Sequence, residues 1–429
     1  MSEKKNVLVV AYVFPPIPYA GTHRTVRLLR GIKGRNICTQ VLTIKTYDDI
    51  PNDNDLLKKI PDDVAVHRTP LIDPWRRFQN WKKTNHSIYG FRYIVKVVSA
   101  FLRFITFPDH MVLWVPFAVY KGLHIIRRNH IDTIYVSSPP HSTQLIGYLL
   151  KKITGKRLVI DFRDPIVGNV GNKSLNDPTD LISRIESRLI RAYERCIVNH
   201  ADAVIVNTET HRSELSRRYG RGSHPNIVTV HNSYDPDDYQ DARKITCDQY
   251  TIAHVGSVYG TRKADILFRA LRILEQEFFP DALKIHVLFV GLNDGALEQS
   301  VKSHGVEKYV TIRKFIPHRE AVSVMVSAHM LLLIKMIGPN SFGQIPGKLF
   351  EYLGAGRKIL CLGPRQSEVA GIIKRMDVGY NVDDDLDELV SILRSEYKAF
   401  LEGKNRRMTG RDVANYSAES MGKRISDLF

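Results

Sequence analysis

The chain has 429 residues, of which 43% are hydrophobic and 25% are charged, a composition that is typical of globular proteins and excludes a disordered chain. This length suffices for two to three domains, each with its own hydrophobic core. The 62 lysine and arginine residues outnumber the 45 aspartate and glutamate residues, and the net charge of +17 favours anionic partners: nucleic acid, phosphorylated substrates or an acidic membrane surface.

The cysteine pattern and the N-terminal residues predict a cytoplasmic protein. The four cysteines are Cys38, Cys196, Cys247 and Cys361. No two of them have the spacing of metal ligands, and three lie in or beside apolar runs, so we expect reduced, buried thiols. The apolar stretch near the N-terminus is short and is broken by two prolines, which argues against a secretory signal. No uncharged apolar run reaches the ~18 residues that a membrane-spanning helix requires.

Strands and helices alternate through the first half of the chain. Residues 6–14 form an apolar run typical of a buried strand, and a loop containing three prolines and Gly21 leads into a helix over residues 22–32. No G-x-G-x-x-G pattern follows this strand, so a dinucleotide fingerprint is absent. Further strands are predicted over residues 39–44, 132–137, 157–162, 203–207 and 227–231, and further helices over residues 144–154, 177–200 and 210–219. This alternation predicts a parallel sheet with helices on both faces.

Residues 67–107 differ from their surroundings because basic and aromatic side chains are interleaved there. Two interpretations of this segment stay open. It forms a helix that lies in an anionic membrane leaflet, or it is an insertion packed on its own domain with its basic side chains reaching into solvent. Nucleic-acid binding is less favoured, and we expect no nucleic-acid partner, because no recognition motif accompanies the segment.

A polar, proline-bearing linker over residues 236–249 precedes a second alternating set. It begins with a strand and a glycine loop over residues 251–260. Further strands are predicted over residues 284–290, 310–315, 330–334 and 359–362, and helices over residues 264–278 and 297–304. The chain is helical and charged from about residue 398 and ends in an amphipathic helix over residues 418–429. The pattern predicts a second doubly wound α/β domain.

A glycine-rich loop over residues 338–346 leads directly into a helix that begins near Gly347. Backbone N–H groups at a helix start form an anion site, and Lys348 adds a positive charge in the first turn. Glu351 follows three residues later on about the same face of the helix. A cation for phosphate beside a carboxylate for hydroxyl groups suits a sugar nucleotide. The alternative is an ordinary helix–strand junction in which Lys348 and Glu351 form a surface ion pair.

In doubly wound sheets, ligands bind beyond the carboxyl ends of the strands, so the residues expected there are the candidate site residues. In the first half of the chain these are Gly21, His141, Arg163, Asp164 and Asn207. In the second half they are Gly256, Arg262, Lys263, Gly291, Phe315, Pro317, Lys348 and Glu351. The second set suits a nucleoside diphosphate, with cations for the phosphates and an aromatic ring near the base. The first set suits an acceptor, with His141 as a candidate base and Asp164 beside Arg163 as a candidate hydroxyl binder.

Seven short segments occur in the order found in one enzyme family. They are FPPIPYAG, SSPPHS, DFRDP, HNSYD, HVGSVYGTRK, VLFVG and PGKLFEYLGAGRKIL. On these segments the chain resembles the family-four glycosyltransferases of the GT-B fold over nearly its full length. The resemblance implies that the C-terminal half binds a nucleotide sugar and the N-terminal half binds the acceptor. It also implies transfer with retention at the anomeric carbon, without a metal or another cofactor, and with a nucleoside diphosphate as product.

The resemblance also implies roles for individual residues. Gly21 matches the loop glycine that lets the backbone approach the diphosphate, and His141 matches a histidine that contacts the transferred sugar. Arg262 or Lys263, together with Lys348, match the cations that bind the diphosphate. Glu351 matches the carboxylate that binds the ribose. His141, Arg262 and Lys348 are accordingly the predicted catalytic residues.

One position departs from the family pattern. Members often carry two glutamates eight positions apart, and the first of these contacts the donor sugar. Here that first position is Gly343. The predicted donor site includes the loop residues Ser341, Gly343, Gln344 and Ile345, and backbone amides around residues 341–344 take the place of the missing carboxylate. Altered donor preference and loss of activity are the alternatives.

These observations predict an α/β fold with two doubly wound, Rossmann-like domains facing across a cleft. We expect an acceptor domain over residues 1–240 with an insertion at about 67–110, a nucleotide-sugar domain over 250–405, and C-terminal helices over 406–429 that return to the first domain. The predicted function is a retaining glycosyltransferase of cell-surface glycan biosynthesis, acting on a saccharide or lipid-linked saccharide at the inner face of the membrane. The alternatives are a nucleotide-sugar epimerase of the same fold and a non-catalytic binding protein.

Overall fold

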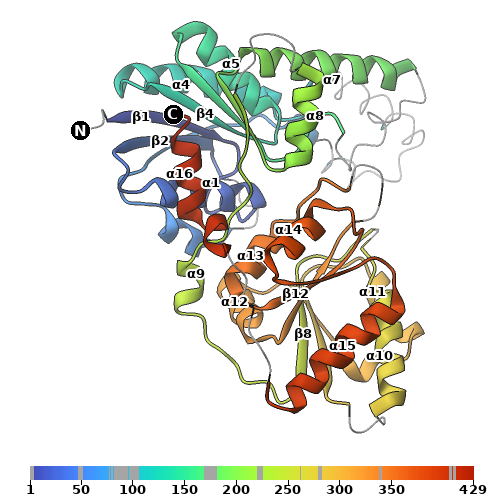
Figure 1. The fold of residues 1–429 in the computed structure, drawn as a ribbon. Helices are drawn as coiled ribbons and strands as arrows, with labels where there is room; N and C mark the ends of the chain where they lie inside the picture. Colours follow the sequence, from blue (N-terminus) through green and yellow to red (C-terminus); the bar gives the residue numbers. More distant parts are fainter. Residues whose placement is uncertain are drawn as a thin grey trace. The chain divides into compact units, whose positions relative to one another are not determined.

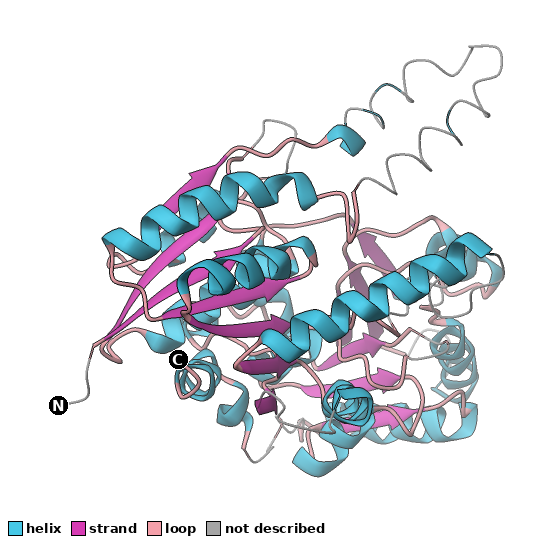
Figure 2. Ribbon diagram, turned by 90° about the horizontal axis from the view of Figure 1, so that it is seen from above, coloured by secondary structure: helices cyan, strands magenta, loops and turns pink. Residues whose placement is uncertain are grey.

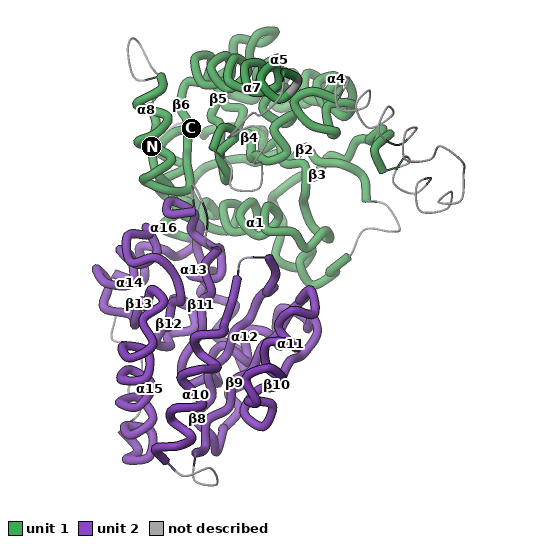
Figure 3. Tube along the Cα trace, turned by 90° about the vertical axis from the view of Figure 1, so that its right-hand side faces the viewer, with its two compact units in different colours: residues 1–231, 419–429 green, residues 232–418 purple. Residues whose placement is uncertain are grey.

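The computed structural model describes residues 4–46, 52–76, 78, 81, 95, 106–168, 181–219, 226–260, 262–278, 283–336, 338, 341–404, 408 and 412–429. The chain folds into two compact units (Figure 3). Unit 1 comprises Met1–His231 and Glu419–Phe429, and unit 2 comprises Asn232–Ala418. Each unit is an α/β domain in which parallel strands lie between layers of helices (Figures 1 and 2).

Within the described part of unit 1, seven parallel strands form one sheet in the order β3-β2-β1-β4-β5-β6-β7. The strands are β1 (Lys5–Ala11), β2 (Ile37–Ile44), β3 (Ala65–Thr69), β4 (Thr133–Ser138), β5 (Arg157–Phe162), β6 (Ala203–Val206) and β7 (Asn226–Thr229). The strand order reverses at β1, which pairs with β2 on one side and β4 on the other. Such a reversal brings the loops after β1 and β4 to the place where doubly wound sheets bind ligands.

Helices cover both faces of this sheet. They are α1 (Ala20–Ile32), α4 (Val115–Arg128), α5 (Ser142–Thr154), α7 (Leu181–His200), α8 (Glu209–Tyr219) and α16 (Ala418–Ser426), with short 3-10 turns η1 (Asn54–Lys59) and η2 (Val112–Trp114). One core cluster joins the sheet to α4, α5, α7 and α8, and a second joins the opposite face to α1 and α16. Residues alternate between the clusters along β1: Leu8 and Val10 face the first, and Val7 and Val9 face the second.

The C-terminal helix α16 packs against the first domain although unit 2 separates the two in sequence. Gly422 lies so close to Gly31 of α1 that a Cβ atom there would overlap the Gly31 backbone. Beyond the helix, Lys5 Nζ donates to the Phe429 carbonyl at 2.5 Å, and Arg157 Nε donates to the Leu428 carbonyl at 2.8 Å. The predicted return of the chain's end to the N-terminal domain is therefore present in the structure.

Within the described part of unit 2, six parallel strands form a sheet in the order β10-β9-β8-β11-β12-β13. The strands are β8 (Tyr250–Val255), β9 (Ile285–Val290), β10 (Val310–Arg313), β11 (Met330–Ile334), β12 (Lys358–Leu362) and β13 (Gly379–Val382). The helices and 3-10 turns are α9 (Asp237–Gln240), α10 (Asp265–Phe278), α11 (Ala296–Ser303), η3 (Glu307–Tyr309), α12 (His318–Ser327), α13 (Lys348–Ala355), α14 (Glu368–Met376), α15 (Leu386–Leu401) and η4 (Val413–Tyr416). The helices α10, α11 and α15 cover one face, and α12, α13 and α14 cover the other.

The structure contains elements that the sequence pattern did not predict. Strand β3 pairs with β2 at the sheet edge, where no strand was predicted and the insertion was expected to begin. Its half-exposed sequence AVHRT lacks the apolar run that marks a buried strand. The helices α4, α12 and α14, the strand β13 and most of α15 were also missed.

Three further expectations concern the membrane and the cysteines. No helix among the described residues is both long enough and apolar enough to cross a membrane. The basic aromatic segment over residues 67–107 lies largely outside the described residues. All four cysteines fall within the described part of the chain and are free thiols. Cys361 alone among them is fully buried, and burial raises the pKa of its thiol to about 12.

Candidate functional site

The carboxyl ends of β8 and β9 approach each other closely in unit 2. Gly291 has φ +144°, a conformation that L side chains rarely adopt, and a Cβ atom on it would overlap the backbone of Gly256. A Cβ atom on Gly256 would lie 3.7 Å from Lys348 Cγ and 3.3 Å from His254 Nε2. Two glycines thus leave an open backbone beside the first turn of α13, where a diphosphate could approach.

Lys348 and Glu351 form an ion pair at the start of α13. Lys348 Nζ lies 2.6 Å from Glu351 Oε2, and the side chains are 33% and 10% exposed. The pair that the alternative interpretation expected is therefore present, but its carboxylate is almost buried rather than on the surface. A buried carboxylate of this kind needs a partner. A ligand phosphate that attracts Lys348 would leave Glu351 available to ligand hydroxyl groups.

Arg262 is held by its own loop beside this pair. Its Nη1 donates to the Ser257 carbonyl at 2.8 Å, its guanidinium lies 5.0 Å from the centre of the Tyr259 ring, and its buried Nε has no partner among the described residues. The neighbouring Lys263 is exposed. Of the two predicted cations in this loop, Arg262 is thus the one that the fold orients.

His254 on β8 lies near Arg262 and Lys348, and the sequence analysis missed it. The ring is buried, its Nδ1 lies 2.9 Å from the Leu332 carbonyl, and its Nε2 has no partner within the described residues. Burial, with smaller contributions from Arg262 and Lys348, lowers the pKa of His254 to about 4. The imidazole is therefore neutral at pH 7, so it adds no further charge between the two cations.

Lys335, a second residue that the sequence analysis missed, binds the loop before α13 through hydrogen bonds to its backbone carbonyls. Its side chain is 1% exposed, and its Nζ donates to the carbonyls of Ser341 and, at 2.7 Å, Gln344. Burial lowers the pKa of Lys335 to about 8. Gly363 leaves room for the lysine stem, since a Cβ atom there would lie 2.7 Å from Lys335 Cβ. The sequence signal was a lysine directly after the apolar strand MLLLI.

The contacts of Lys335 orient the loop's amide groups. In a trans peptide, the C=O of one residue and the N–H of the next point in opposite directions. Because the carbonyls of Ser341 and Gln344 point to Lys335, the N–H groups of Phe342 and Ile345 point away from it. These two amides donate to no acceptor within the described part of the chain. The Ile345 side chain itself is buried in the core, so this residue offers only its backbone to a ligand.

The remaining predicted donor residues also lie near the carboxyl ends of the unit 2 strands. Phe315 follows β10 and its ring is 71% exposed, while Pro317 is the residue before α12. Gly343 and Gln344 are half-buried in the loop before α13. The structure thus brings Gly256, Arg262, Lys348 and Glu351 together, and it places Phe315 at the neighbouring strand end as an accessible ring.

In unit 1, Arg163 lies against Gly21. A Cβ atom on Gly21 would lie 2.5 Å from Arg163 Nη1, and the Arg163 guanidinium donates to the Pro139 carbonyl. Gly21 was expected in the loop before the helix, but it lies in the first turn of α1 and is buried. The glycine is needed there because the arginine occupies the space of its side chain. Arg163 thereby links α1 to the loop after β4.

His141 directly precedes α5, in the loop that follows the carboxyl end of β4. Its buried Nδ1 has no partner among the described residues, and its carbonyl accepts from Tyr193 Oη at 2.7 Å. Burial lowers the pKa of His141, opposed by the carboxylates of Asp109 and Asp164. The ring is therefore neutral at pH 7 and can accept a proton from a ligand.

A buried ion network that the sequence did not reveal supports these loops. Arg24 binds Asp161 through two hydrogen bonds of 2.7 and 2.8 Å, and Tyr135 Oη donates to Asp161 at 2.5 Å. Arg24 also donates to the carbonyls of Val230 and His231. These contacts tie α1 to the carboxyl ends of β5 and β7.

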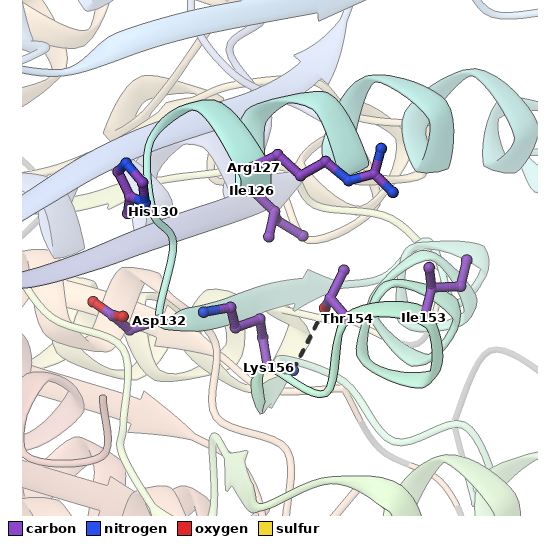
Figure 4. A pocket seen from close by; sticks show the side chains of 7 residues that line it. All are labelled: Ile126, Arg127, His130, Asp132, Ile153, Thr154 and Lys156. Atoms are coloured by element: carbon purple, nitrogen blue, oxygen red, sulfur yellow. Dashed lines mark hydrogen bonds between the residues drawn. The ribbon is translucent and has the colours of Figure 1, made fainter.

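A surface depression of about 550 Å³ lies elsewhere in unit 1 (Figure 4). It is lined by Arg127, His130, Asp132 and Lys156 together with three other residues. Asp132 directly precedes β4 and Lys156 directly precedes β5, so the depression lies at the amino ends of the strands. It is therefore separate from the candidate site residues. No cluster of potential metal ligands occurs among the described residues.

Comparison with known proteins identifies a related domain and a related fold. Residues 21–233 match the model of the glycosyl transferase 4-like domain. No curated protein is significantly similar to the chain in sequence. Sucrose-phosphate synthase from Thermosynechococcus elongatus has a similar structure, with TM-score 0.66 and 13% identity over 99% of this chain and 98% of that one.

Two other solved structures share the fold. HepE from Anabaena, in complex with UDP-glucose, has TM-score 0.59 and 13% identity over 98% of both chains. WaaG, a glycosyltransferase involved in lipopolysaccharide biosynthesis, has TM-score 0.56 and 15% identity over 99% of both chains. Residues 21–233 thus match a glycosyl transferase 4-like domain, and the chain has the two-domain GT-B fold over its whole length.

Proposed function

We propose that the protein transfers a sugar from a nucleotide-sugar donor to a saccharide or lipid-linked saccharide acceptor, with retention at the anomeric carbon. The donor binds at the carboxyl ends of the unit 2 strands, and unit 1 supplies the acceptor site. The observation that carries the proposal is the grouping of Arg262, Lys348 and Glu351 around the open backbone of Gly256. The UDP-glucose complex of HepE, a protein of the same fold, supports the donor class.

The charges of the site suit the breaking of a sugar–phosphate bond. As the bond between the anomeric carbon and the diphosphate oxygen breaks, negative charge grows on the leaving diphosphate. Arg262, Lys348 and the N–H groups at the start of α13 stabilise that charge. The amides of Phe342 and Ile345 bind the donor where Gly343 replaces a carboxylate. The carbon then bonds to the acceptor oxygen, whose proton is lost to His141 or to solvent.

Donor binding exchanges the partners of Lys348. The ammonium leaves Glu351 for a donor phosphate, and the freed carboxylate accepts hydrogen bonds from the ribose hydroxyl groups. Both new contacts involve an ion, so each is worth about 1.5–3 kcal/mol.

Calorimetric titration with nucleoside diphosphates and with inorganic diphosphate tests this exchange. Lys348→Met should weaken binding of both ligands by about ten- to hundredfold, because one charged phosphate contact is lost. Glu351→Gln should weaken binding of the nucleoside diphosphates but not of inorganic diphosphate, which has no ribose. Lys374→Met, the same change at an exposed position of α14, is the matched control and should bind like the wild type.

Turnover assays complete the test. An acceptor-dependent release of nucleoside diphosphate, with the anomeric configuration of the donor preserved in the product, supports the proposal. Release of free nucleotide or an epimerised sugar without any acceptor supports the epimerase instead. Unchanged binding in both Lys348→Met and Glu351→Gln contradicts the donor site.

The proposal places the protein at the inner face of a membrane as a peripheral protein. The net charge of +17 suits an anionic leaflet, and a lipid-linked acceptor would lie there. WaaG, which shares the fold, takes part in lipopolysaccharide biosynthesis.

A further inference from the structure

The helix α7 carries an unusual outer face. It spans 20 residues, a length of about 30 Å, and lies along the outside of unit 1 (Figure 1). Its inner face packs into the core through Ile190, Ile197 and Val198, which are nearly inaccessible to solvent. The outer face therefore determines what α7 presents to partners.

Three large aliphatic side chains form a stripe on that outer face. Leu181, Ile185 and Leu189 are 73%, 48% and 46% exposed. Their spacing of four residues places them one above the other on the helix surface. A helix at the surface of a soluble domain carries polar side chains in such positions. An aligned stripe of exposed aliphatic groups indicates a surface that becomes covered.

Arginines form a second stripe directly beside the first. Arg184, Arg188, Arg191 and Arg195 are all exposed. At 3.6 residues per turn, they fall within a sector of about 60° that adjoins the aliphatic sector.

Acidic side chains do not offset this charge on the described outer face of α7. Glu186 is half-buried, and Glu194 is buried against Arg218, 3.2 Å away, and Tyr219, 2.7 Å away. The outer face of α7 is therefore both apolar and strongly basic.

We propose that the outer face of α7 is the surface by which the protein docks on an anionic lipid bilayer. The aliphatic stripe enters the boundary between head groups and acyl chains. The arginine side chains reach sideways to the lipid phosphates, which a guanidinium binds through two parallel hydrogen bonds.

Other partners fit this face less well. A symmetric dimer through α7 would bring the four arginines of one copy against those of the other, because a two-fold interface joins the same patch on both subunits. A nucleic acid would neutralise the arginines but leave the aliphatic stripe in water, since bases stack on aromatic rings and not on leucine or isoleucine. An anionic bilayer buries the aliphatic stripe and also supplies phosphates for the arginines.

This inference deepens the membrane part of the proposed function and names the surface responsible. Binding to vesicles is measured without donor or acceptor, so it can fail while the transferase activity stands. In the same way, the absence of transferase activity would leave the result on α7 intact.

Sedimentation with vesicles tests the docking surface. The wild-type protein should bind vesicles that contain phosphatidylglycerol, bind vesicles of pure phosphatidylcholine far less, and be released by high salt. Arg184→Gln with Arg188→Gln should weaken binding to the anionic vesicles about 25-fold, at about fivefold for each arginine. Changing the three aliphatic residues of the stripe to serine should weaken binding by at least about tenfold and at every salt concentration.

The controls test whether binding depends on where the charges lie or only on how many there are. Lys302→Gln with Arg319→Gln removes the same charge from exposed positions on α11 and α12 of unit 2 and should leave binding nearly unchanged. All the substituted side chains are exposed, so far-ultraviolet circular dichroism and thermal unfolding should match the wild type. Wild-type binding by both α7 variants would overturn the assignment to this helix, and so would a wild-type protein that ignores anionic vesicles. A change of oligomeric state in the α7 variants without lipid would identify a second copy as the partner.

Discussion

Replacement of Lys335 by methionine tests whether a buried charge shapes the donor loop. The lysine Nζ holds the carbonyls of Ser341 and Gln344, and Cys361 and Glu368 are its electrostatic neighbours. Methionine fills a similar volume but donates no hydrogen bond. The two carbonyls would then be released, and the N–H groups of the same peptides would lose the orientation that the proposed donor contacts require.

The structure sets the expected magnitudes for this variant. Lowering of the Lys335 pKa from 10.5 to about 8 means that burial disfavours the ammonium by about 3 kcal/mol. Two hydrogen bonds from a charged donor contribute about 3–6 kcal/mol in the opposite sense. The free energy of unfolding should therefore fall by about 0–3 kcal/mol, while affinity for a nucleoside diphosphate falls by about ten- to hundredfold because the ligand must now order the loop.

Denaturant unfolding and calorimetric titration measure both quantities. Lys358→Met is the matched control: this lysine is the first residue of β12 and pairs with Glu396 at 2.5 Å, so it lies at the amino end of the strand, away from the candidate site, and donor affinity should not change. The pH dependence adds an independent readout. Because the folded-state pKa of Lys335 lies below the unfolded value, the unfolded chain binds more protons between about pH 8 and 10.5, and stability rises over this window. Wild-type donor affinity in Lys335→Met, or the same rise in its stability, would refute the reasoning.

Three further substitutions probe the rest of the site. Gly21→Ala should displace Arg163 and lower the free energy of unfolding by about 1–3 kcal/mol, whereas Gly347→Ala, with nothing within 4 Å of its added atom, should be nearly neutral in urea denaturation. His254 is neutral when folded because its pKa is lowered to about 4, so the wild-type protein should lose about 3 kcal/mol of stability as pH falls from about 6.5 to 4. Over the same pH range, the stability of His254→Gln should fall by about 3 kcal/mol less than that of the wild type. A pH profile identical to that of the wild type would contradict the assigned burial. Asp161→Asn should cost about 3–5 kcal/mol of unfolding free energy by leaving a buried arginine without its ion partner, and a loss below 1 kcal/mol would show that water reaches the site.

Much of the fold follows from short-range patterns in the sequence. The apolar runs over residues 157–162 and 330–334 coincide with β5 and β11, because a strand buried on both faces needs a continuous apolar sequence. Edge strand β3 escaped prediction because its side chains are half-exposed and its pairing with β2 supplies its order. The resemblance of ordered motifs to one family correctly indicated the two-domain fold.

The candidate site divides in the same way. Local sequence was sufficient to suggest Lys348 and Glu351, since the loop, the helix start and their spacing of three residues are all local. It could not suggest Lys335 or His254, because burial of a charged or titratable group is decided by the residues that surround it.

The sequence by itself determined most of the buried strands, several of the helices, the glycine-rich loop and the cations near it, because each depends on residues within a few positions of one another. Only the tertiary structure decided that Arg163 lies on Gly21 and that Arg24 binds Asp161, residues more than 130 positions apart. It also placed arginines beside an exposed aliphatic stripe on α7. The physical reason is that contacts between distant segments, and the exposure left after packing, arise from the whole fold.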